Sequence, residues 1–173
     1  MNLLETIEKE YTKAQCAKIV NYIGDNPTRF KKLVDVFFAG PYRITQRSAW
    51  PLNKCVELHP ELIKPHLKRM LLYLKKREIP TAVKRNIVRL LQFIKIPKSL
   101  QGLTADICFG FLQDKKEPVA VRVFAMTVLT NLVKNVPELK NELIPLIEDQ
   151  MPYGSPGFRS RGSKALRAIG QSH

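Results

Sequence analysis

Apolar residues recur along most of the chain at spacings of three and four, which is the spacing of one face of an α-helix. After Pro118 the apolar positions are Val121, Ala125, Leu129 and Leu132. Similar positions follow three other prolines, and successive members of this set lie 39, 38 and 38 residues apart: Pro41, Pro80, Pro118 and Pro156. Proline fits the first turn of a helix, where its missing N–H is not needed. The pattern therefore predicts a repeat of paired helices, which is typical of a solenoid.

A second helix with its own apolar face follows within each repeat, over Glu61–Arg77, Lys98–Gln113 and Glu138–Met151. Two earlier helices are expected near Leu3–Ile23 and Pro27–Ala39, and a closing helix over Phe158–Gly170. We therefore predict an all-α protein of about nine helices, with Pro51 inside one of them. We expect one domain over residues 1–173: a leading pair over 1–39, repeats over 40–78, 79–116 and 117–154, and a closing half-repeat over 155–173.

The stretch Pro118-Val119-Ala120-Val121-Arg122-Val123-Phe124-Ala125 resembles the proline, valine–arginine, alanine signature that opens a HEAT repeat. The resemblance to the HEAT/armadillo superfamily covers Pro41 to about Ile169 and implies a right-handed α-solenoid. One departure is Thr45, which stands where the other repeats have Lys84, Arg122 and Arg159. Solenoids of this superfamily serve as scaffolds, adaptors and a few enzymes, so the fold alone does not define a function.

Composition narrows the class of protein without naming a partner. The chain has 173 residues, of which 45% are hydrophobic, as in a globular helical protein. No apolar run approaches the length of about 20 residues that a membrane span needs, and no secretion signal is evident, so we expect no membrane association and a cytoplasmic location. Cys16, Cys55 and Cys108 are far apart, and His59, His66 and His173 share no ligand spacing. The sequence predicts no metal site and no cofactor.

The net charge of +14 is concentrated in residues 26–98, which hold seventeen bases and four acids. Many of these bases recur at helical spacing, so stacked helices are expected to merge them into one basic surface that attracts anions. The candidate residues for binding an anionic partner are Arg43, Arg47, Lys64, Lys68, Arg69, Lys75, Arg85 and Arg89. Trp50 and Tyr73 lie near them and are candidates for stacking on a nucleobase. The alternative is that these bases are ordinary solvent-facing residues, and that the ladder Lys84, Arg122 and Arg159 is structural.

Two hypotheses for function follow. The first is a non-enzymatic binding or scaffold module that engages an acidic protein or a phosphate-bearing partner. The second is a nucleic-acid-binding protein, because the chain is similar to bacterial HEAT-like alkylpurine DNA glycosylases, which are small, basic and all-helical. That family places tryptophans and a carboxylate in its groove. Here Trp50 is the single tryptophan, Lys54 stands one turn after it, and Glu57 is the nearest carboxylate on that face. With no catalytic motif evident, we expect a binding protein rather than an enzyme.

Overall fold

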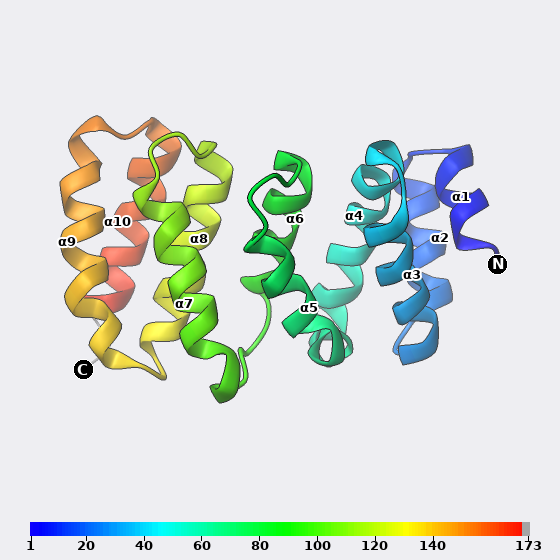
Figure 1. Ribbon diagram of the computed structural model, residues 1–173, viewed down its shortest axis with the longest axis horizontal. Helices are drawn as coiled ribbons and strands as arrows, with labels where there is room; N and C mark the ends of the chain where they lie inside the picture. Colours follow the sequence, from blue (N-terminus) through cyan, green and yellow to red (C-terminus); the bar gives the residue numbers. More distant parts are fainter. Residues whose placement is uncertain (171–173) are drawn as a thin grey trace. The chain divides into compact units, whose positions relative to one another are not determined.

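The computed structural model describes residues 1–170, and the last three residues, which include His173, lie outside the described part (Figure 1). No strand occurs among residues 1–170, so the predicted all-α class is confirmed. The α-helices are α1 (Leu3–Lys9), α2 (Lys13–Ile23), α3 (Pro27–Ala39), α4 (Tyr42–Leu58), α5 (Lys64–Leu74), α6 (Thr81–Leu91), α7 (Lys98–Gln113), α8 (Val119–Val133), α9 (Lys140–Gln150) and α10 (Pro156–Gly170). Three short 3₁₀ helices are η1 (Pro60–Ile63), η2 (Pro137–Leu139) and η3 (Met151–Tyr153).

The repeat prolines mark helix starts, as their spacing predicted. Pro41, Pro80 and Pro118 each immediately precede the first helical residue, and Pro156 is the first residue of α10. The carbonyl of Pro41 accepts from the Thr45 N–H at 3.1 Å, which is the first intrahelical bond of α4. Proline thus supplies an acceptor to the first turn without leaving an N–H unpaired.

The leading segment differs from the prediction, because the helix expected near Leu3–Ile23 is two helices. The break between the two helices lies at Thr12. Its Oγ1 accepts from the Gln15 N–H at 3.1 Å and donates to Glu10 Oε1 at 2.7 Å. These bonds make Thr12 the N-cap of α2 and hold its backbone extended. The described chain therefore has ten α-helices rather than about nine. By contrast, α4 runs through Pro51 without a break in the helix assignment, as expected.

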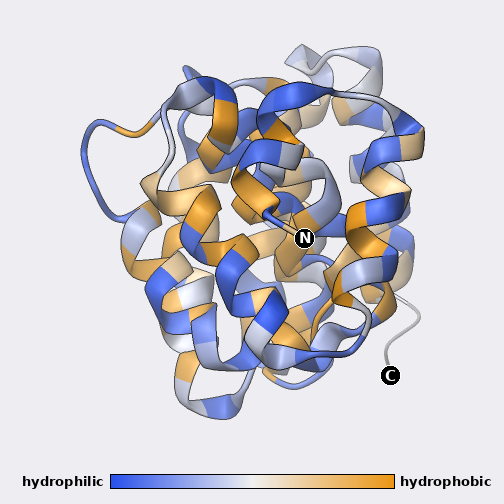
Figure 2. Ribbon diagram, turned by 90° about the vertical axis from the view of Figure 1, so that its right-hand side faces the viewer, coloured by the Kyte–Doolittle hydropathy of each residue, from blue (hydrophilic) through white to orange (hydrophobic). Residues whose placement is uncertain are grey.

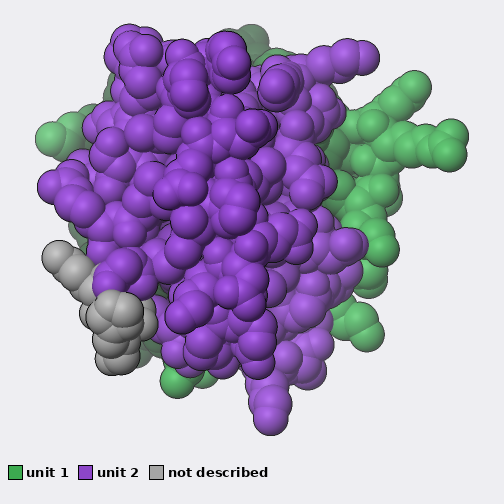
Figure 3. Space-filling model, turned by 90° about the vertical axis from the view of Figure 1, so that its left-hand side faces the viewer, with its two compact units in different colours: residues 1–95 green, residues 96–173 purple. Residues whose placement is uncertain are grey.

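The described residues form two compact units, over 1–95 and 96–170 (Figure 3). In the first, α4 packs against α2, α3 and α6; in the second, α8 packs against α7 and α10. The repeat predicted over residues 79–116 contributes α6 to the first unit and α7 to the second. Hydrophobic and hydrophilic residues alternate along individual helices (Figure 2), as the sequence pattern required. No helix within residues 1–170 combines the length and the apolar character needed to cross a bilayer.

The apolar positions that follow each proline form the core of both units. Almost all are buried: Ile44, Leu52, Cys55, Val83, Ile87, Leu91, Val121, Ala125, Leu129, Leu132, Phe158 and Ile169. Ile94 is only half-buried, because α6 ends at Leu91 before the predicted stripe does. The departure at Thr45 also has a structural reason, since its buried hydroxyl donates to the Phe37 carbonyl at 2.9 Å in the last turn of α3. A lysine or arginine at position 45 would place a charged group where the buried hydroxyl now makes this bond.

Candidate anion-binding surface

The predicted basic residues fall on two different sets of helices within the first unit. Four of them lie on α4 and α6, which pack against each other: Arg43, Arg47, Arg85 and Arg89. The other four lie on α5 or at its C-terminal end: Lys64, Lys68, Arg69 and Lys75. Helix α5 contacts α3 through the Phe38–Tyr73 and Phe30–His66 ring pairs. The predicted residues therefore fall into two groups, one on α4 and α6 and one on α5, and the groups differ in how many of their charges are free.

On α4, Arg47 is a structural residue. Its Nη1 donates to the carbonyls of Ile7 at 3.2 Å and Glu8 at 2.7 Å. These carbonyls belong to the last turn of α1, where backbone acceptors have no partner within the helix. The half-buried guanidinium therefore ties α1 to α4. Arg43, by contrast, is exposed on the same helix.

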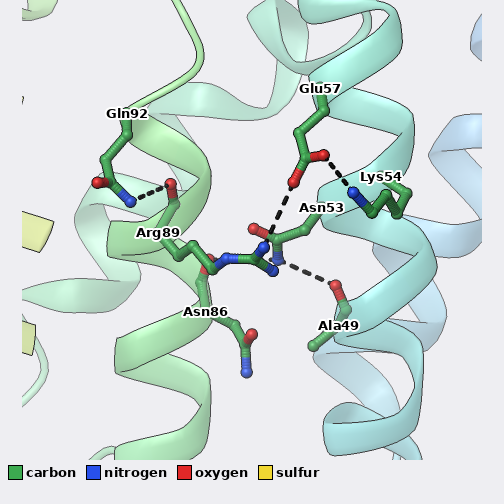
Figure 4. A network of polar contacts seen from close by, with 7 residues as sticks. All are labelled: Ala49, Asn53, Lys54, Glu57, Asn86, Arg89 and Gln92. Carbon is green, nitrogen blue, oxygen red and sulfur yellow. Dashed lines mark hydrogen bonds and ion pairs between the residues drawn. The ribbon is translucent and has the colours of Figure 1, made fainter. Parts of the chain in front are cut away.

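Arg89 is held in a polar network between α4 and α6 (Figure 4). The Glu57 carboxylate accepts from Lys54 Nζ at 2.6 Å and from Arg89 Nη2 at 3.4 Å, and its side chain is only 20% exposed. Beside Arg89, the fully buried Asn53 donates from Nδ2 to the Ala49 carbonyl at 2.9 Å. One acid thus binds two bases, and the carboxylate that follows Trp50 on the same helix is occupied by both of them.

Trp50 lies on the side of α4 that faces α2, where Lys13 and Lys54 line the same groove. Its ring packs edge-on against Tyr11, with centroids 5.5 Å apart, and is half-buried. It borders an apolar groove of about 230 Å³ between α2 and α4, together with Val20 and Leu58. Cys16 also lines this groove, and burial raises the pKa of its thiol. The contacts of Trp50 are therefore those of helix packing.

The bases of α3 and α5 are much more exposed. The two helices carry six bases, Arg29, Lys31, Lys32, Lys64, Lys68 and Arg69, against one acid, Asp35. Lys64, Lys68 and Lys75 are exposed and form no ion pair with another residue of the described chain. This surface therefore keeps most of its positive charge available to a partner.

A groove of about 520 Å³ opens on this surface between α5 and α3. Its lining combines three cations with apolar side chains: Phe38, Lys68, Arg69, Leu72, Tyr73 and Lys76. The Tyr73 and Phe38 rings contact each other, with centroids 5.1 Å apart. We call this feature the α3/α5 groove. Three predicted residues, Lys68, Arg69 and Tyr73, meet in it, whereas the other predicted residues lie elsewhere.

Arg69 is held in place within the α3/α5 groove. Its Nη1 lies 3.0 Å from Asp35 Oδ1, and its guanidinium lies over the Phe38 ring, 4.4 Å from the centroid. Lys31 also binds Asp35, at 2.7 Å. The Lys31 ammonium and then the Arg69 guanidinium hold the pKa of the Asp35 carboxyl below its ordinary value. Asp35 therefore stays ionised and orients Arg69 over a wide range of pH.

Three residues that line this groove were not predicted from the sequence: Phe38, Leu72 and Lys76. The side chain of Phe38 is half-buried. Leu72 is 49% exposed, and Lys76 lies just beyond the end of α5 with Nζ 4.8 Å from the Tyr73 centroid. Leu72 departs from the buried phase of α5 set by Leu67, Met70, Leu71 and Leu74. That departure was the available signal, since an exposed leucine beside bases marks an amphipathic surface.

In the second unit, Arg122 supports the structural interpretation of the basic ladder. It donates from Nη2 to the Gln150 side chain, and Gln150 Nε2 donates to the Leu112 carbonyl at 3.1 Å. The guanidinium also lies over the Phe158 ring, 4.8 Å from its centroid. Burial lowers the pKa of Arg122. This arginine links α7, α8, α9 and α10, so its role is in repeat packing.

Repeated helix pairs, proline-marked helix starts and a packing arginine define a helical-repeat protein. The family model of the HEAT repeat domain matches residues 3–169, and the chain belongs to this family. The match includes the leading helices, over which the resemblance in the sequence fades. HEAT repeats commonly mediate protein interactions, which makes an interaction or scaffold role the general expectation for this fold. Comparison with curated proteins and with solved structures gives no significant match.

Proposed function

We propose that this protein is a non-enzymatic binding module that uses the exposed bases of α3 and α5 to hold an acidic protein segment. The observation that carries the proposal is the α3/α5 groove, where exposed apolar surface and free positive charge lie together. Charged rims steer a partner and set its orientation, while buried apolar contacts supply most of the affinity. A helical-repeat fold suits this task, because its stacked helices present an extended surface.

The distribution of free charge favours an acidic protein over a nucleic acid. A nucleic-acid backbone requires bases spread along its track, and the candidates for such a track include Arg47 and Arg89. Both are occupied, by backbone carbonyls and by Glu57. Among the bases without an ion pair in the described chain, Lys68 and Lys76 line an apolar groove on one helix pair. The same contacts support a non-enzymatic role, since the Glu57 carboxylate is already bound by two cations.

Fluorescence anisotropy tests the proposal with four labelled probes: a glutamate-rich peptide, single-stranded DNA, duplex DNA and single-stranded RNA, each at several salt concentrations. We expect the peptide to bind at about 50 mM salt and to dissociate as salt screens the charges. Replacing Lys68 or Lys76 with glutamate should weaken peptide binding about threefold to tenfold, because each variant turns an exposed attraction into a repulsion.

Two control variants make the same change of charge elsewhere on the protein, so they distinguish the effect of position from the effect of net charge. Lys134→Glu makes the same change of charge on an exposed residue of the second unit and should leave binding nearly unchanged. Arg85→Glu tests the exposed part of the α4/α6 surface and should also have little effect. Equal losses in all four variants would show a non-specific effect of net charge. Tight nucleic-acid binding without peptide binding would replace this proposal with the nucleic-acid hypothesis.

A further inference from the structure

The floor of the α3/α5 groove is apolar, although its rim is charged. Leu72, Tyr73 and Phe38 supply the floor, and Lys68, Arg69 and Lys76 surround it. Its volume of about 520 Å³ exceeds the roughly 150 Å³ that suffices for a benzene-sized group. The groove therefore has room for one aromatic or branched aliphatic side chain and for part of the backbone that carries it.

Two cations of the groove lie over its aromatic rings, where a stacked nucleobase would have to bind. Lys76 Nζ lies over the Tyr73 ring, and Arg69 lies over the Phe38 ring. A base that stacked on Tyr73 would compete with Lys76 and with the contact to Phe38. An apolar side chain needs no free ring face, since it can contact Leu72 and the ring edges. These contacts leave Lys68 and Lys76 available to carboxylates.

The spacing of the lysines defines the pattern of acids that would match them. Lys68 and Leu72 are four residues apart on one side of α5. Lys76 lies two residues beyond the helix, in a further turn where its N–H donates to the Tyr73 carbonyl at 3.1 Å. At about 1.5–2 Å per residue, Lys68 and Lys76 are roughly 12 Å apart along this direction, with Leu72 between them. An extended peptide advances about 3.3 Å per residue, so it covers this distance in about four residues. Two acids, each two positions from a central apolar residue, fit the two lysines.

Resting on the proposed function, we infer that the α3/α5 groove recognises an acidic segment with one anchoring apolar side chain. The anchor lies against Leu72, Tyr73 and Phe38. Carboxylates two positions before and after it pair with Lys68 and Lys76. Arg69, already oriented by Asp35, contributes positive charge at the side of the anchor. The groove thereby selects among acidic proteins, which charge alone does not do.

Three labelled nine-residue peptides test this inference at 50 mM and 150 mM salt. The first has the sequence DSDSFSDSD, the second has alanine in place of phenylalanine, and the third has the phenylalanine moved to one end. All three carry the same charge. We expect the first to bind about tenfold more tightly than the other two, because burial of an aromatic side chain contributes substantially to affinity.

Two exposed leucines provide the matched variants. Leu72→Ser removes the aliphatic side chain from the floor of the groove and leaves Tyr73 and Phe38 in place. Leu58→Ser removes a leucine that is 62% exposed on α4, outside the groove. Both variants should fold, since neither residue belongs to the core. Leu72→Ser should reduce the tenfold preference to less than twofold while leaving the affinity for the alanine peptide unchanged. Leu58→Ser should preserve the preference.

The outcomes separate this inference from the proposed function. Equal affinity for all three peptides, with binding still lost in Lys68→Glu, would overturn the anchor and leave the basic surface standing. An equal loss of preference in both leucine variants would also overturn it. Absence of binding by any acidic peptide at 50 mM salt would overturn the proposed function as well.

Discussion

Gly162 offers a sharp test of the packing between repeats. It is buried in α10, at the position after Pro156 that corresponds to Ala125 and Ser48 in two earlier repeats. A Cβ added there would overlap Met151 Sδ and would lie 3.2 Å from Ile147 Cγ2. Met151 is half-exposed and can turn away, whereas Ile147 is fully buried and β-branched. We therefore expect Gly162→Ala to be destabilising, because the neighbouring helix must give way.

The expected magnitude is the difference between two effects. Overpacking a core costs about 1–3 kcal/mol, while alanine in place of glycine within a helix gains up to about 1 kcal/mol. Gly162→Ala should therefore lower the free energy of unfolding by about 1 kcal/mol. Gly102 is the matched control, because it lies inside α7 in the same unit, and nothing lies within 4 Å of its added Cβ. Gly102→Ala should raise the free energy of unfolding by about 0.5–1 kcal/mol.

Urea denaturation followed by far-UV circular dichroism measures both variants. With a denaturant slope of about 2 kcal/mol per molar, a difference of about 2 kcal/mol separates their midpoints by about 1 M. An unchanged slope would show that only stability has altered. A midpoint for Gly162→Ala at or above that of the unsubstituted protein would refute the close packing of α10 against α9 and η3.

Three further predictions concern the first unit and the buried thiols. Arg47→Ala should expose the amides of α1 to faster hydrogen exchange, because two carbonyl bonds are lost, while Arg43→Ala should not. Cys55 and Cys108, whose pKa burial raises to about 12, should react with a thiol reagent at pH 8 only when the protein unfolds. Burial lowers the pKa of His66, so near pH 6.5 the unfolded state binds more protons than the folded state. The free energy of unfolding should therefore decrease as the pH is lowered from 7.5 to 5.5. His66→Phe should weaken this pH dependence, as measured by urea denaturation at several pH values.

The repeat was predictable because it depends on local signals. Proline placement and apolar phase act within one helix, so the starts of α4, α6, α8 and α10 and most of their buried faces agree with the prediction. The division of α1 from α2 was missed, because the capping bonds of Thr12 involve three polar residues that do not interrupt the apolar phase. A threonine two residues after a glutamate is too common a pattern to mark a helix boundary alone.

The candidate site was only partly predictable. The positions of the bases on their helices follow from spacing, but their neutralisation depends on residues far apart in sequence. Arg47 meets α1 carbonyls about 40 residues away, and Arg89 meets Glu57 32 residues away. Helical phase carries no information about such contacts. The same limit applies to Phe38, whose exposure depends on where α5 lies against α3.

Backbone amide chemical shifts, measured by ¹⁵N NMR during titration with the DSDSFSDSD peptide, test the central claim most directly, since they report which helices contact an acidic segment. The account predicts the largest shifts over Lys68–Lys76, with smaller ones near Asp35 and Phe38, and shifts near Lys68 and Lys76 that diminish at high salt. The largest shifts on α4 and α6, around Arg43 and Arg85, would contradict it.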